Sequence, residues 1–256
     1  MSMKEQLQIP QMQKYTLSQV SASDIQEFYT CPRRFYLYRV LRLGRLSDRS
    51  PNAPSNRGSI IHLLLEWGST DQAQQLFQRN QVSEEQAREM LEVVTRFQES
   101  AYMRRMQERG ELKKEQAFYL RLLADGQAPR YLKGFIDALM WQEDGSLLVI
   151  DYKTGASEKS AADYQVQADC YALAGLAMGA ESVQVQMVRP EVCDAQGEPQ
   201  CFTFDYAACQ QDMLRKDLLV AIDLMEDAQN ASLDGVDVNR CKYECPIFGT
   251  LCSGPV

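Results

Sequence analysis

Three side chains able to hold a divalent cation and a phosphate lie within one largely apolar stretch, Gly134 to Gly155. Asp151 and Lys153 are two residues apart, so on a strand they would project from the same face. Asp137 precedes the turn sequence Asp144-Gly145 by about as many residues as Asp151 follows it, so a hairpin would bring the two carboxylates together. Carboxylate oxygens suit Mg²⁺, and a lysine can stabilise charge that builds on a phosphate. The stretch predicts a metal-dependent phosphodiesterase centre, although Asp-x-Lys alone is also typical of an exposed hairpin.

The rest of such a centre has to come from other parts of the chain. His62 is the only histidine, in the sequence GSIIHLLLEWG, and it would add a nitrogen ligand. A lone histidine is more often structural, but the other candidate ligands supply no nitrogen, so we interpret His62 as a ligand. Gln167 and Tyr171 are four residues apart and would share one helix face beside the lysine strand. An ordinary amphipathic helix with Tyr171 in the core is the alternative.

The hydrophobic pattern predicts an α/β fold with a helical elaboration on its N-terminal side. We expect one domain over residues 1–256, made of a tail (1–20), a mainly helical part (21–112), an α/β core (113–230) and a loop-like cysteine tail (231–256). In chain order, the expected elements are a helical hairpin broken at Cys31-Pro32, a loop over 47–58, a helix over 59–67, a helical insertion over 70–110, strands over 115–123, 131–142 and 146–152, a helix over 161–178, strands over 181–189 and 200–206, and a helix from 205 or 206 to 229.

Composition indicates a soluble, cytoplasmic protein. The chain contains no apolar run of the roughly 20 residues that a membrane span needs, and its first residues lack the apolar core of a signal peptide. The formal net charge is -8, yet the segment from Cys31 to Ile60 contains seven arginines and one acidic residue. This local excess of positive charge predicts either a solvated helix face or a surface that contacts phosphates.

Taken together, the motifs resemble the RecB-like branch of the PD-(D/E)xK nuclease superfamily, which includes AddB-type helicase-nucleases and CRISPR-associated iron-sulfur exonucleases. The similar segments run in the same order over about residues 21–252: TCPRRFYLYRV, GSIIH, GFIDAL, VIDYKTG, QADCY and CKYECPIFGTLC. The resemblance implies a restriction-endonuclease-like mixed sheet flanked by helices.

The resemblance also implies roles for individual residues. His62, Asp137 and Asp151 would be ligands of Mg²⁺ or Mn²⁺, and Lys153 would be the catalytic lysine. Gln167 and Tyr171 would support the active site or the DNA strand. Glu115 is a secondary candidate that is equally well explained as a surface glutamate. The arginine-rich segment supplies two further candidate DNA contacts, Arg33 and Arg34.

The cysteines predict a second site. Eight cysteines in a chain without an export signal favour metal ligation over disulfides for any clustered subset, here Cys241, Cys245 and Cys252. With Cys31 as fourth ligand, the resemblance implies a 4Fe-4S cluster. The tail reads C-x3-C-x6-C, one residue longer in each gap than the usual spacing of iron-sulfur members, so zinc and unliganded thiols remain alternatives. The remaining cysteines are expected to be small packing residues: Cys170, Cys193, Cys201 and Cys209.

The resulting hypothesis is a metal-dependent DNA nuclease, specifically a single-strand exonuclease stabilised by a 4Fe-4S cluster. It would act in DNA repair and recombination or in CRISPR spacer acquisition, with a helicase or CRISPR adaptation proteins as partners and no membrane. One alternative is a non-catalytic DNA-end-binding module of a helicase-nuclease complex. Another is a cysteine-ligated zinc protein unrelated to DNA.

Overall fold

The computed structural model describes residues 11–43, 54–67, 72–122, 128–155, 158–234, 236–245, 248 and 252. The chain divides into two compact units. The first unit comprises residues 1–47, 121–133 and 215–256, and the second comprises residues 48–120 and 134–214. No helix in the described ranges has both the length and the apolar character needed to cross a membrane.

Six strands form one mixed sheet, which confirms the expected α/β class. Its strands are β1 (Gln19–Val20), β2 (Lys113–Leu122), β3 (Arg130–Trp141), β4 (Leu147–Tyr152), β5 (Ser182–Cys193) and β6 (Pro199–Ala207). Their order is β1-β3-β4-β5-β6, and β2 pairs with β3 outside this path. The β1-β3 and β4-β5 pairs are parallel, and the β3-β4 and β5-β6 pairs are antiparallel.

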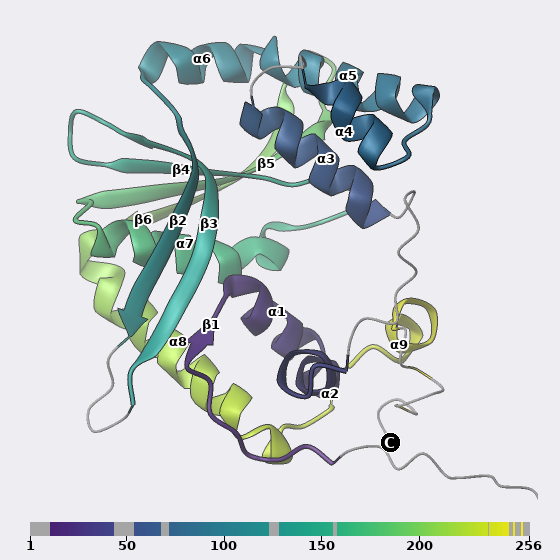
Figure 1. Ribbon diagram of the computed structural model, residues 1–256. Coiled ribbons are helices and arrows are strands. Elements are labelled where there is room, and N and C mark those ends of the chain that lie inside the picture. Colours follow the sequence, from purple (N-terminus) through teal and green to yellow (C-terminus); the bar gives the residue numbers. More distant parts are fainter. Residues whose placement is uncertain are drawn as a thin grey trace, which may run out of the picture. The chain divides into compact units, whose positions relative to one another are not determined.

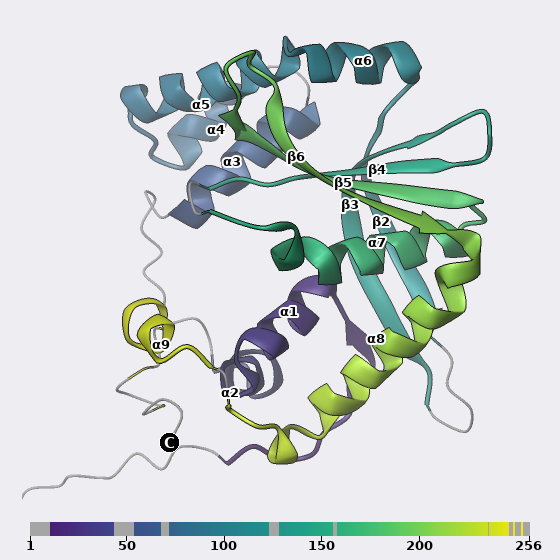
Figure 2. The same cartoon turned by 180° about the vertical axis from the view of Figure 1, so that it is seen from behind.

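In the second unit, helices lie on both faces of β4 and β5 (Figures 1 and 2). One face carries α3 (Pro54–Trp67), α4 (Ala73–Arg79), α5 (Glu84–Gln98) and α6 (Ala101–Arg109). The other face carries α7 (Gln165–Ala177), which follows the 3-10 turn η2 (Ala161–Tyr164). All six residues of β4 are buried, as expected for a central strand that is covered on both faces.

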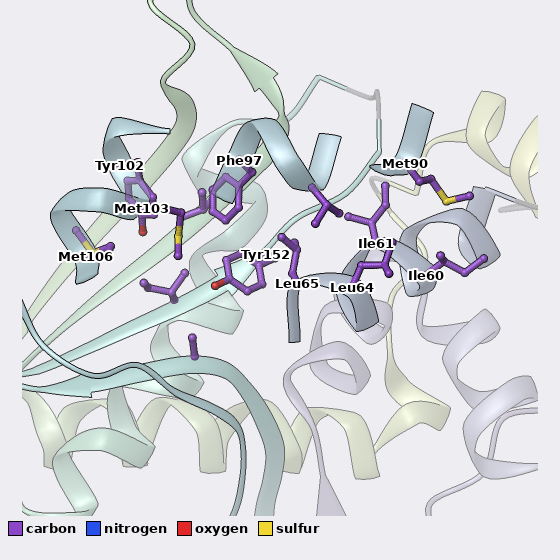
Figure 3. Close-up of a cluster of buried hydrophobic side chains, with 14 of the residues drawn as sticks. Ile60, Ile61, Leu64, Leu65, Met90, Phe97, Tyr102, Met103, Met106 and Tyr152 are labelled. Atoms are coloured by element: carbon purple, nitrogen blue, oxygen red, sulfur yellow. The ribbon is translucent and has the colours of Figure 1, made fainter. Parts of the chain in front are cut away.

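A hydrophobic cluster joins the helices α3 to α6 to the sheet (Figure 3). Phe97 of α5 is 2% exposed, and its ring packs edge-on against Tyr152 with centroids 5.6 Å apart. Because Tyr152 lies between Asp151 and Lys153, this cluster fixes the strand that carries two of the candidate site residues.

The first unit contains helices around the start of β3. Its elements are α1 (Ala22–Thr30), α2 (Pro32–Phe35), the π-helical turn η1 (Tyr36–Val40), most of α8 (Gln211–Glu226), the turn η4 (Ala228–Asn230) and α9 (Val238–Glu244). Ser21 caps α1 in a capping box with Asp24. Buried Arg130 of β3 binds Glu226 and Asp223 of α8, each at 2.7 Å.

Several element boundaries differ from those expected. Helix α3 begins at Pro54, inside the expected loop, most of which lies outside the described residues. Helix α8 begins at Gln211 after the 3-10 turn η3 (Ala208–Gln210), because residues 205–207 belong to β6. The expected loop-like tail was wrong over α9, where Asp237 caps a short helix through Asn239. Cys209 is exposed, so it is not a packing residue.

Candidate functional site

Asp137 and Asp151 meet where β3 and β4 separate. The paired residues of the two strands run from Trp141 opposite Leu147 to Ala138 opposite Ile150. Asp137 comes directly before Ala138 on β3, and Asp151 comes directly after Ile150 on β4, so both lie one residue beyond the last pair. The Oδ2 atom of Asp137 accepts a hydrogen bond from the Tyr152 backbone N–H at 2.7 Å. A side chain of β3 thereby satisfies the backbone of β4 at the point where the strands part.

The Asp151 carboxylate is almost completely buried, with 3% of the residue exposed. Its Oδ2 atom accepts hydrogen bonds from Tyr171 Oη at 2.7 Å and Gln167 Nε2 at 2.8 Å, and Lys153 Nζ lies 2.5 Å from Oδ1. Gln167 Oε1 also accepts a hydrogen bond from Lys153 Nζ at 2.5 Å. Burial raises the pKa of Asp151 above its usual value, and the opposing effect of Lys153 does not cancel this rise.

His62 approaches the two carboxylates from α3. Its Nδ1 atom lies 3.3 Å from Asp137 Oδ2. Burial lowers the pKa of His62, but the hydrogen bond with Asp137 and the charge of that carboxylate together raise it by more, so the net shift is upward. A carboxylate at Nδ1 fixes the ring orientation and leaves Nε2 as the nitrogen that can bind a cation.

Glu115 lies in the same neighbourhood. It lines a pocket of about 1000 Å³ together with His62 and Glu66 of α3. Burial raises the pKa of Glu115, and Asp137 and Glu66 raise it further. Its φ of 49° places it in the left-handed region, which costs a non-glycine residue on the order of 1 kcal/mol. Glu115 is thus within electrostatic reach of the central carboxylates.

Sequence reasoning missed a carboxylate that ties two parts of the site together. Glu191 of β5 accepts a hydrogen bond from the Gly155 N–H at 2.7 Å through Oε2 and forms an ion pair with Arg57 of α3 through Oε1. Arg189 donates a hydrogen bond to the Gly155 carbonyl at 2.8 Å. These contacts connect the helix of His62 to the loop that follows Lys153. No local motif marks Glu191, because it lies 36 residues beyond Gly155.

Gly58 permits a close approach between the same two segments. A Cβ atom at this position would lie 2.5 Å from Thr154 Oγ1. A larger residue would force either the Thr154 hydroxyl or the first turns of α3 to move. The glycine four residues before His62 thus permits this close approach without rearrangement.

Comparison with known proteins assigns the chain to a family. The sequence pattern of the PD-(D/E)XK nuclease superfamily matches residues 19–252. The chain belongs to the PD-(D/E)XK nuclease superfamily. No curated protein matches the sequence. Among solved structures, the crystal structure of SSO0001 is similar over 95% of this chain and 90% of that one, with 17% identity and a TM-score of 0.48.

Nucleases of this superfamily use divalent metals such as Mg²⁺. Within the described residues, no group of three or more His, Cys, Asp or Glu side chains is already arranged as a metal cage. The Lys153 ammonium lies against the buried Oδ1 atom of Asp151. The donor types fit a hard cation, since Asp137 and Asp151 supply oxygens and His62 supplies a nitrogen.

The four cysteines of the predicted cluster all belong to the first unit. Burial raises the pKa of Cys31, and Cys252 and Cys245 raise it further. Burial also raises the pKa of Cys241, followed by the charges of Cys31, Cys245 and Cys252. The four sulfurs are therefore within electrostatic reach of one another. All eight cysteines are described and each is a free thiol.

The two predicted DNA-contacting arginines make contacts within the protein. Arg33 Nη1 lies 3.5 Å from Cys252 Sγ, and Arg34 Nε lies 3.2 Å from Glu27 Oε1. Arg39 of the same segment pairs with Asp24 and Glu27. Arg45 and Arg49 lie outside the described residues. Part of the local positive charge is thus neutralised internally, and DNA contact by Arg33 and Arg34 stays a prediction.

We expect Glu191→Ala to loosen the loop after Lys153. The variant removes a charged acceptor from the Gly155 N–H, and a hydrogen bond of this kind corresponds to about 10-fold or more in the local opening equilibrium. Amide hydrogen exchange of the metal-free protein measures this directly. Glu198→Ala is the matched control, because it removes a comparable ion pair with Arg105 (2.6 Å) in the same unit. Equal exchange at Gly155 in the parent and Glu191→Ala would contradict the anchoring role.

Metal binding should depend on pH in a defined direction. Because folding raises the pKa of Asp151, protonation of this carboxyl stabilises the metal-free native state. That stabilisation is lost as the pH rises through the folded-state pKa. A cation competes with that proton, so the increase in melting temperature produced by Mn²⁺ should grow as the pH rises above about 4, the usual pKa of an aspartate. Thermal unfolding with and without Mn²⁺ tests this, and Asp151→Asn should remove the effect.

Proposed function

We propose that this chain is a metal-dependent DNA nuclease that hydrolyses phosphodiester bonds, acting as an exonuclease on single-stranded ends. The observation that carries the proposal is the convergence of Asp137, Asp151 and Lys153 with His62 at the point where β3 and β4 separate. A purely structural ion pair would need neither the second carboxylate nor the imidazole.

Each residue of the site has a proposed role that follows from its chemistry. Asp137, Asp151 and His62 would hold Mg²⁺ or Mn²⁺, which polarises the scissile phosphate and lowers the pKa of an attacking water. Lys153 would orient that water or stabilise negative charge on the phosphate in the transition state. Gln167 bridges Lys153 and Asp151, and Tyr171 holds Asp151 Oδ2, so both keep the carboxylate and the ammonium in register. Glu115 is a candidate for a further oxygen ligand or for orienting water.

The motif order supports the finer assignment to the RecB-like branch. That assignment carries with it a role in DNA repair and recombination or in CRISPR spacer acquisition, beside a helicase or CRISPR adaptation proteins. The same motif order supports a 4Fe-4S cluster held by Cys31, Cys241, Cys245 and Cys252, with zinc as the competing ligand; the four thiols belong to one unit and lie within electrostatic reach of one another.

Lys153→Ala and Asp151→Asn should each lower Mn²⁺-dependent cleavage of labelled single-stranded DNA by about 100-fold or more. The first variant removes the positive charge that would stabilise the transition state, and the second removes a charged ligand of the proposed metal ion. Gel assays with substrates blocked at one end would measure both the rate and the polarity. Lys159→Ala is the matched control, since Lys159 is an exposed lysine six residues away. Variants that cleave as fast as the parent would refute the assigned centre. A parent that binds DNA without cleaving it would instead indicate an end-binding module.

Anaerobically purified protein should be brown and contain iron and sulfide in a ratio close to one. Cys31→Ala should lose the visible absorption and lower the melting temperature, because one of four ligands is gone. Cys209→Ala, which changes an exposed cysteine outside the set, is the control. A colourless protein that contains stoichiometric zinc would overturn the iron-sulfur assignment and leave the nuclease centre unaffected.

A further inference from the structure

Two aromatic side chains on neighbouring strands of the second unit are unusually exposed. Phe135 of β3 is 63% exposed and Tyr119 of β2 is 60% exposed, the highest values among the large hydrophobic residues in the described ranges. Leaving an aromatic ring of this size in water forgoes roughly 1.5–3 kcal/mol of burial. Two such rings on neighbouring strands indicate a surface with a binding role.

Both rings project from the same face of the sheet. Strands β2 and β3 pair with each other, and Figures 1 and 2 show them side by side. A Cβ atom on Gly134 would lie 2.7 Å from the ring of Phe118, so residues 134 and 118 share one face. The next residue on each strand, Phe135 and Tyr119, therefore projects from the opposite face. Side chains on one face of neighbouring strands are close enough for aromatic rings to act together.

This face continues to the candidate metal ligand Asp137. Exposure alternates over four residues of β3: Phe135 is exposed, Ile136 is buried, Asp137 is half-buried and Ala138 is buried. Phe135 and Asp137 thus project from the same face, about 7 Å apart along the strand. If a DNA strand bound with one phosphate beside Asp137, the neighbouring base would lie within reach of the Phe135 ring.

We propose that Phe135 and Tyr119 form a stacking shelf for unpaired nucleotide bases next to the scissile phosphate. The proposal rests on the proposed function and adds the residues that select a single strand. Aromatic rings stack on any base, so the shelf tolerates every sequence. In a duplex the bases are already stacked and paired, and their faces are not available to the rings. The shelf therefore favours single strands over duplexes without reading sequence.

The first test is equilibrium binding of single-stranded oligonucleotides in EDTA, so that no cleavage occurs. Phe135→Ala should weaken binding about 10-fold, and Phe135→Trp should retain it, because stacking energy is lost in the first variant and kept in the second. The dependence of affinity on salt should be the same in all variants, since no charge is changed. Trp141→Ala is the matched control: Trp141 is an exposed aromatic (41%) at the far end of the same strand.

A second test locates the base. An oligonucleotide with an abasic site at the stacked position should bind the parent more weakly, and Phe135→Ala should then cause little further loss. In Mn²⁺, Phe135→Ala should raise the KM for single-stranded DNA with kcat changed by no more than about 2-fold.

The outcomes separate the two proposals. If the parent binds single strands through Phe135 but cuts nothing, the shelf stands and the proposed nuclease function fails. If the parent cuts DNA while Phe135→Ala binds and cuts as the parent does, the shelf is wrong and the nuclease function stands. Unchanged DNA binding together with loss of self-association in Phe135→Ala would assign this face to a second copy of the chain and overturn the shelf.

Discussion

The candidate site depends on holding one carboxyl group, that of Asp151, in a buried position beside the Lys153 ammonium. Removing a carboxylate from water costs several kcal/mol unless charge and hydrogen bonds compensate. Here part of that cost is offset by Lys153, which follows β4, and by Gln167 and Tyr171 on one face of α7. Removing any one of them would leave a charge or a polar group without its partner, so the group behaves as a unit.

The second carboxylate of the site, that of Asp137, explains why distant elements have to meet. Asp137 can take the Tyr152 N–H only because β3 leaves β4 at this point, and His62 can reach Asp137 only if the start of α3 lies close to the loop after Lys153. Gly58 allows that approach. Glu191 stabilises it by pairing with Arg57 of α3 and by accepting a hydrogen bond from the Gly155 N–H in the loop. The Asp137 carboxylate therefore both satisfies the Tyr152 backbone N–H and orients the His62 ring.

Much of this could be predicted from the sequence, because the informative signals are local. The strand alternation, the Asp144-Gly145 turn and the four-residue spacing of Gln167 and Tyr171 each involve neighbours in sequence, and the strands, the turn and the helix appear close to where they were expected. The convergence of His62 with Asp137 was inferred from family resemblance and from histidine being otherwise absent. Neither periodicity nor spacing could have supplied it.

Other features were out of reach for physical reasons. Glu191 acts through contacts with residues 36 and 134 positions away, and no pattern in its own strand distinguishes it from a surface glutamate. The exposure of Phe135 could not be read from GFIDAL, where a phenylalanine between apolar residues predicts burial. Helix α9 was missed because its seven residues are too few to show a period.

The solitary position of His62 has an experimental consequence. A protein with one imidazole gives one pair of histidine ring resonances in a proton spectrum, free of overlap from other histidines. Because that ring lies 3.3 Å from Asp137, its chemical shift responds to whatever occupies the space between the carboxylates. The chain thus carries a built-in spectroscopic reporter at the centre of its candidate site, and cation or nucleotide binding can be followed there without any label.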